Sequence, residues 1–140
     1  MQRKLEALRH CLGRVRERRP ASASLLAIDE DLQDVLVLNL SRAVQLCVDI
    51  AAHLVAASRQ PVPATMGETF SSLAASGAID ADLADRLRRA VGFRNIAVHN
   101  YEAIDWGIRV FVDKRLLGRL RAVCGPGERR ALNPRRPVRN

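Results

Sequence analysis

A chain of 140 residues is long enough for one compact domain with a hydrophobic core and too short for two. Hydrophobic residues make up 48% of the chain and aromatic residues only 4%, so the core must consist of Leu, Val, Ile and Ala, which favours helices over sheets. The net charge of +8 favours a polyanionic partner, and no apolar run approaches the ~20 residues that cross a bilayer, so we expect a soluble protein with no membrane partner.

Apolar residues at spacings of three and four predict an amphipathic helix over residues 2–18 with a basic outer face, which ends before Pro20. The longest helical pattern follows, from about residue 25 to Ser58. As one unbroken helix it would be ~50 Å long, which exceeds the width of a domain of this size. Its ends should therefore project or pack on a second copy.

After two prolines, Thr65 and Glu68 stand in the spacing of a capping box and predict the start of a short helix, which stops near Gly77. Asp80 begins the next helix. Asn100 is the predicted end of that helix, because asparagine tolerates left-handed backbone geometry better than most residues.

A last helix is expected from about Trp106, before a basic tail that we predict to be disordered. The domain boundaries follow from this pattern: a helical domain over residues 1–123 and the tail over residues 124–140. The predicted fold is all-α, an up-and-down bundle of four to five helices that includes one long helix.

The positive charge lies at the two ends of the chain. Residues 1–19 carry seven basic and two acidic side chains, and residues 124–140 carry five basic and one acidic side chain. Such clusters bind phosphates and favour RNA as a partner, although a solvated helix face and an inert tail have the same composition.

The cysteines and histidines do not indicate a metal site or a disulfide framework. Three cysteines are widely spaced without a CxxC pair, and three histidines lie in unrelated contexts. We therefore predict no metal and no cofactor. The arginine-rich start lacks the apolar segment of a secretory signal, and we expect a cytoplasmic protein.

The most informative stretch runs from Arg94 to Tyr101 and has the form Arg-x4-His-x-Tyr. Arginine presents a planar fork of donors to phosphate oxygens, and the imidazole of His99 can move protons near neutral pH. Arg94 and His99 are the candidate catalytic residues. Asn95 lies one helical turn before His99 and is a candidate supporting residue that contacts the ring or a phosphate.

This motif, together with the run Val91-Gly92-Phe93 before it and Glu102-Ala103-Ile104-Asp105 after it, resembles the signature of the HEPN superfamily, specifically the HepT toxins of HepT/MntA toxin–antitoxin pairs. The stretch 42–51 resembles the long second helix of that family. The resemblance covers residues 1 to 122 and implies a HEPN-like fold and a homodimer whose active site forms in a cleft between two subunits.

Arg94 and His99 are five residues apart and cannot share one helix face, so either the helix breaks near Asn100 or a second copy contributes its own pair. The resemblance favours the second arrangement. It implies a metal-independent endoribonuclease toxin that cleaves mRNA or tRNA by attack of the ribose 2′-hydroxyl. It also implies that an MntA-like nucleotidyltransferase antitoxin silences the toxin by attaching AMP to Tyr101.

Two residues of the long helix are further candidates for the site. Asp49 is a candidate acceptor that orients His99, and Gln45 lies one turn earlier. Two alternative functions stay open: a non-catalytic helical partner of a nucleotidyltransferase, and a basic RNA-binding module without turnover.

Overall fold

The computed structural model describes residues 1–20, 22–58 and 60–104, and all regular structure within these ranges is helical. In chain order the elements are α1 (Gln2–Arg18), α2 (Ala23–Ile28), α3 (Glu30–Ala57), α4 (Met66–Ala75), α5 (Ala81–His99) and the short 3₁₀ helix η1 (Tyr101–Ala103). The prediction of an all-α bundle with one long helix is confirmed. The predicted last helix from about Trp106, Cys124 and the basic tail lie outside the described residues.

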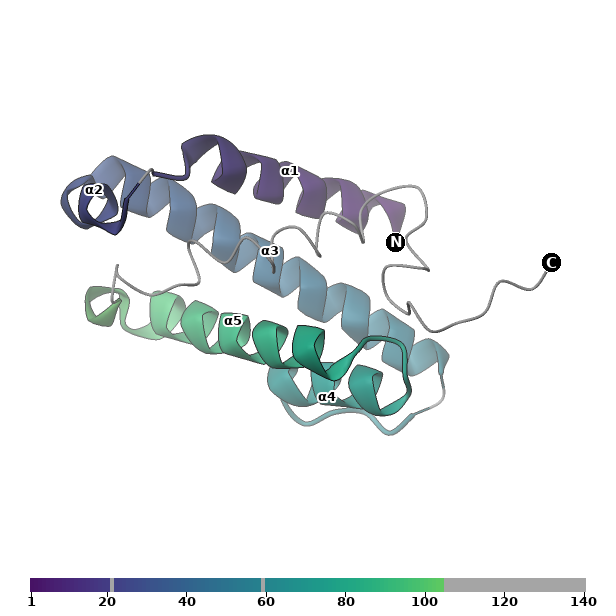
Figure 1. The fold of residues 1–140 in the computed structure, drawn as a ribbon. Coiled ribbons are helices and arrows are strands. Elements are labelled where there is room, and N and C mark those ends of the chain that lie inside the picture. Colours follow the sequence, from purple (N-terminus) through teal and green to yellow (C-terminus); the bar gives the residue numbers. More distant parts are fainter. Residues whose placement is uncertain (21, 59, 105–140) are drawn as a thin grey trace.

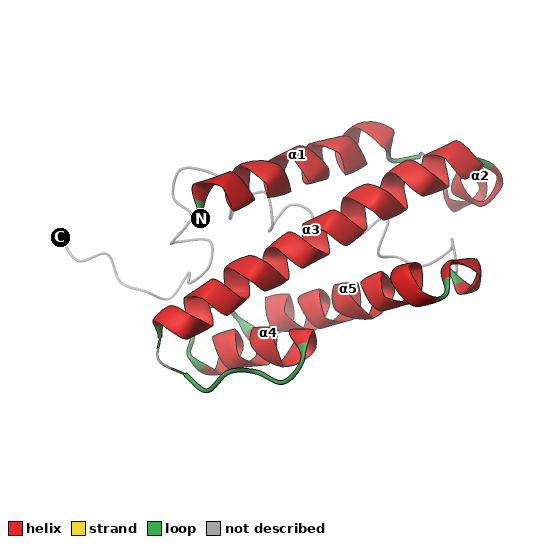
Figure 2. Cartoon of the chain, turned by 180° about the vertical axis from the view of Figure 1, so that it is seen from behind, coloured by secondary structure: helices red, strands yellow, loops and turns green. Residues whose placement is uncertain are grey.

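Helix α3 is the centre of the bundle. Helices α1 and α5 flank it and run in the opposite direction, and α4 packs beside its C-terminal half (Figure 1). The view from behind shows the same arrangement (Figure 2). As a result, the C-terminal end of α5 and the η1 turn lie at the same end of the bundle as α2 and the start of α3.

The core draws on all five α-helices, which explains why they pack as one unit. Its largest fully buried side chains are Leu8, Leu12, Val15, Leu26, Leu36, Val55, Phe70 and Leu83. Burying each of these side chains stabilises the fold by about 1.5–3 kcal/mol relative to leaving it exposed. The free thiols Cys11 and Cys47 are buried in the same core.

The long helical pattern is broken at Asp29, so the prediction of one helix from residue 25 to Ser58 is wrong. Asp29 has extended backbone angles (φ −106°, ψ 97°), and its carboxylate accepts a hydrogen bond from the N–H of Leu32 at 3.0 Å. Gln33, which is buried, donates to the carbonyl of Leu26 at 2.8 Å and ties α2 to α3. An N-cap within the apolar pattern thus divides it, because aspartate satisfies the free N–H groups of a new helix start.

The predicted ends of α4 and the start of α5 are confirmed. Thr65 accepts from the N–H of Glu68 at 3.2 Å, and the Glu68 carboxylate accepts from the N–H of Ala64 at 2.9 Å, which completes the capping box one residue further back than usual. Gly77 has a φ of 75°, and the N–H of Ala78 bonds the carbonyl of Leu73 at 3.0 Å. This closing turn requires the left-handed geometry that glycine adopts without strain.

Helix α3 is, in the part of the chain that the structure describes, the one helix long and apolar enough to span a membrane by length and composition. The expectation from the sequence that no apolar segment is long enough to cross a bilayer is therefore wrong on length and composition alone. In the structure, 56% of the apolar window is buried inside the protein, where α1, α4 and α5 cover it. This is the environment of a central core helix.

Candidate active site at the end of helix α5

Helix α5 carries the Arg-x4-His motif without interruption. The Asp80 carboxylate accepts from the N–H of Leu83 at 2.8 Å and starts the helix, which continues to His99. The N–H of Asn100 closes the last turn on the carbonyl of Ile96 at 2.8 Å. Asn100 ends the helix as predicted, but with a φ of −151° rather than in left-handed geometry, because the chain passes directly into η1.

Since the helix is unbroken, Arg94 and His99 point to sides of α5 about 140° apart and are displaced by about 7.5 Å along its axis. Arg94 is half-buried and His99 is exposed. The break at Asn100 comes after both residues and so does not bring them together. The arrangement that uses a second copy stays a prediction.

Asn95 lies between the two candidate catalytic residues. Its side-chain oxygen accepts a hydrogen bond from Nη1 of Arg94 at 3.4 Å, and it stands one turn before His99 on the exposed side of the helix. The long arginine side chain therefore bends toward the face that carries His99. The supporting role of Asn95 stays a prediction.

Tyr101, in the η1 turn, reaches across to α3. Its hydroxyl donates a hydrogen bond to Oδ1 of Asp34 at 2.6 Å, and the tyrosine is 39% exposed. Desolvation by burial raises the pKa of Tyr101 to about 12, with further contributions from the hydrogen bond to Asp34 and from the negative charges of Asp34 and Glu30. The hydroxyl is thus held in its protonated form.

Sequence reasoning missed Asp34. The residue follows Glu30 and Asp31 in the first turns of α3, where carboxylates are expected to interact with the positive end of the helix dipole. Because this local role accounts for Asp34, the sequence gives no reason to expect its contact with Tyr101, which is 67 residues away in the chain.

Asp49 and Gln45 lie elsewhere on α3. Gln45 donates to the Asp49 carboxylate at 3.0 Å, and the other oxygen of Asp49 pairs with Nζ of Lys4 in α1 at 3.2 Å. Asp49 is fifteen residues beyond Asp34, about 22 Å along the helix. Within one protomer, the structure therefore does not bring Asp49 or Gln45 to His99.

The outer face of α5 is exposed and partly apolar around the motif. Gly92, Asn95, Ile96 and His99 follow one another at helical spacing on this face. Ile96 is 41% exposed and the neighbouring Val98 is 55% exposed. A Cβ atom added at Gly92 would meet nothing within 4 Å, so no other part of the chain covers this face there.

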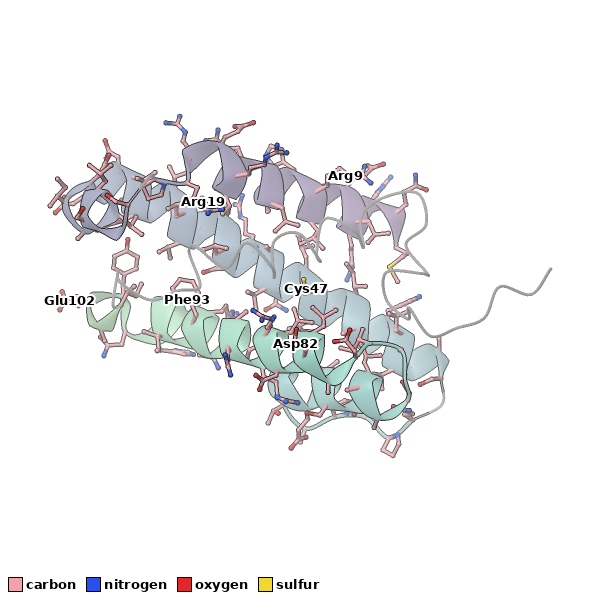
Figure 3. The ribbon with its side chains drawn as sticks, viewed as in Figure 1. Arg9, Arg19, Cys47, Asp82, Phe93 and Glu102 are labelled. Atoms are coloured by element: carbon pink, nitrogen blue, oxygen red, sulfur yellow. The ribbon has the colours of Figure 1, made fainter. Side chains whose placement is uncertain are left out.

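The inner face of α5 is closed by packing. Phe93, which is 4% exposed, lies on the side of the helix that faces α3, whereas Glu102 projects from the end of the bundle (Figure 3). Arg9 and Arg19 mark the basic N-terminal segment on the other side of α3 (Figure 3). The motif therefore occupies the edge of the bundle, with its imidazole on the outside.

Within residues 1–104, apart from the two positions left out, no three His, Cys, Asp or Glu side chains group in a way that could hold a metal ion. The functional groups at the end of α5 are a guanidinium, an amide, an imidazole, a phenol and the carboxylate of Asp34.

Known proteins share this chain's sequence and fold over most of its length. Residues 8–123 match the family described as Ribonuclease HepT-like. The chain is 34% identical over 109 residues to the mRNA nuclease HepT of Shewanella oneidensis, an alignment that covers 78% of this chain and 81% of that protein.

Solved structures of toxin–antitoxin complexes also resemble this chain in fold. A crystal structure of a toxin–antitoxin with AMP-PNP matches with a TM-score of 0.77 and 30% identity, over 87% of this chain and 92% of the other. A tri-AMPylated Shewanella oneidensis HEPN toxin in complex with MNT antitoxin matches with a TM-score of 0.77 and 31% identity, over 87% and 91%. The chain belongs to the HepT-like ribonuclease family of HEPN toxins.

Proposed function

We propose that this protein is a metal-independent endoribonuclease toxin of a toxin–antitoxin pair, with Arg94 and His99 from two protomers in one cleft. The observation that carries the proposal is the placement of these residues on one unbroken helix of a HepT-like chain, with the imidazole exposed and the guanidinium directed to the same edge. The mRNA nuclease among its relatives favours mRNA as the substrate.

The reaction needs a proton acceptor, a proton donor and a positive charge. A general base removes the proton of the ribose 2′-hydroxyl, the oxygen attacks the adjacent phosphorus, and the leaving 5′-oxygen is protonated. Two copies of His99 supply both roles, and Arg94 stabilises the charge that accumulates on the phosphorane oxygens. The products are a 2′,3′-cyclic phosphate and a 5′-hydroxyl, so DNA is not cut by this route.

The proposal includes a homodimer. The backbone positions of Arg94 and His99 are about 140° apart around α5, but the Arg94 guanidinium bends to Asn95, one turn before His99, so a twofold axis beside this face would bring two copies of both groups to one cleft. The open strip formed by Gly92 and Ile96 offers a surface for that contact. The partner would cover side chains that are exposed in the single chain.

The proposal includes regulation at Tyr101. An AMP group attached to its hydroxyl adds bulk and negative charge two residues after His99. The bulk blocks access of RNA to the site, and the negative charge repels the RNA phosphates. A Tyr101→Phe variant should keep nuclease activity and escape inhibition by an MntA-like nucleotidyltransferase antitoxin. Efficient silencing of this variant by the antitoxin would count against the assignment.

The central experiment incubates the purified protein with RNA in EDTA. Wild type should cleave, and Arg94→Ala and His99→Ala should stay folded but inactive. Two matched controls remove the same side-chain types elsewhere: Arg89→Ala, an exposed arginine on α5, and His53→Ala, an exposed histidine on α3. Both controls should cleave like wild type.

Binding of intact RNA by wild type, without cleavage, would favour an RNA-binding module. Failure to bind RNA, with retained binding to an MNT nucleotidyltransferase, would favour a non-catalytic partner. Growth arrest on expression that His99→Ala relieves is the corresponding result in cells.

A further inference from the structure

The shortest side-chain hydrogen bond at the site joins two residues whose relation no motif describes. The hydroxyl of Tyr101 lies 2.6 Å from Oδ1 of Asp34, and both side chains are exposed, so an incoming reagent can reach the oxygen while the carboxylate holds it. Glu30 lies one turn before Asp34 on the same side of α3 and adds a second negative charge near the phenol.

A phenol that becomes a nucleophile must lose its proton. With a pKa of about 12, only about one Tyr101 hydroxyl in 100,000 is ionised at pH 7, so attack by a preformed phenolate would be slow. A carboxylate already in hydrogen-bond contact solves this problem, because it accepts the proton as the new bond forms.

We propose that Asp34 positions the Tyr101 hydroxyl and accepts its proton when the oxygen attacks the α-phosphorus of a nucleoside triphosphate held by the MNT antitoxin. The inference rests on the proposed modification of Tyr101. In this step the bond from Oη to phosphorus forms, the bond from phosphorus to pyrophosphate breaks, and the proton passes from Oη to Asp34. Pyrophosphate leaves, and a tyrosyl–AMP phosphodiester remains on the toxin.

Attachment of AMP to Tyr101 would remove this hydrogen bond to Asp34. The phosphodiester has no hydroxyl to donate, and its negative charge would stand beside the carboxylates of Asp34 and Glu30. Like charges at this distance repel, so the modified side chain turns away from α3.

The test measures AMP incorporation by intact-protein mass in a mixture of toxin, ATP, Mg²⁺ and an MNT antitoxin, either the cognate one or that of the Shewanella oneidensis pair. Asp34→Asn keeps an acceptor for the hydroxyl but cannot take its proton, and its modification rate should fall at least about 100-fold at neutral pH. Asp31→Asn, an exposed aspartate in the same helical turn, is the matched control and should be modified at the wild-type rate.

A pH profile separates proton transfer from a merely structural role. The rate for Asp34→Asn should rise steeply with pH between about 7 and 10, as phenolate forms, whereas the wild-type rate should depend on pH far less. RNA cleavage by unmodified Asp34→Asn should equal that of wild type, because Asp34 does not contact the proposed catalytic residues.

The outcomes distinguish this inference from the proposed function. Modification of Tyr101→Phe, or no modification of wild type by either antitoxin, would overturn both the modification site and the role of Asp34. If Tyr101→Phe resists modification while Asp34→Asn is modified as fast as wild type, only the role of Asp34 fails, and the antitoxin itself supplies the base.

Discussion

Removing the Tyr101 hydroxyl should destabilise the fold at neutral pH and not at strongly alkaline pH. In the native state, the pKa of Tyr101 is raised from 10 to about 12. At ~1.4 kcal/mol per pKa unit this shift corresponds to an upper limit of about 2.7 kcal/mol. Because the side chain is 39% exposed, solvent screening reduces the expected contribution to about 1 kcal/mol.

The sign of the pH dependence follows from proton linkage. The native state holds the proton more tightly than the unfolded state, so the stabilisation is fully present below pH 10 and is lost as the pH rises through 12. Tyr101→Phe lacks this proton. The difference in unfolding free energy between wild type and variant should therefore be about 1 kcal/mol at pH 7 and fall steadily as the pH rises from 10 to 12.

Urea denaturation followed by helical circular dichroism measures both values, and comparison with the variant cancels the titration of all other groups. The chain has a single tyrosine, so the absorbance of ionised tyrosine reports Tyr101 directly. Asp34→Asn should lower its pKa toward 10, and the double variant should be no less stable than Tyr101→Phe. Two results would refute the reasoning. One is a free-energy difference that stays constant across this pH range, and the other is a Tyr101 pKa in Asp34→Asn that is unchanged from wild type.

Three further predictions concern the dimer and the core. An equimolar mixture of wild type and His99→Ala, refolded together, should cleave RNA at about half the rate of the same amount of wild type alone, because half of the wild-type chains then share a cleft that has one imidazole in place of two; an undiminished rate would argue against a shared cleft. Ile96→Glu should yield monomers in analytical ultracentrifugation and lose cleavage while staying helical, since it places a charge on the exposed strip of α5; an active dimer would exclude this strip. Phe70→Ala, at a fully buried position, should lower the unfolding free energy by about 3–5 kcal/mol, whereas Val62→Ala, which is 93% exposed, should change it little, and equal effects would contradict the assigned core.

The relative positions of Arg94, His99 and Tyr101 could be predicted because these residues lie close together in the chain. The Arg-x4-His-x-Tyr motif spans eight residues of one helix and its following turn, so its spacing alone defines the angle between Arg94 and His99. Asp80 caps the start of that helix through a hydrogen bond to Leu83, which is only three residues further along the chain. Whether two protomers join at this helix stays a prediction, because the single chain shows only the exposed surface that such a contact would use.

The sequence by itself predicted most of the helices and the caps at Thr65 and Asp80, since apolar spacing and capping residues act within four or five positions of the chain, but it did not predict the break at Asp29. Only the tertiary structure decided which distant side chains meet. Asp34 contacts Tyr101 across 67 residues and Asp49 pairs with Lys4 across 45, and no periodic pattern encodes either contact. Such pairs depend on how α1 and α5 pack against α3, and that arrangement is set by burial of the whole core rather than by any local signal.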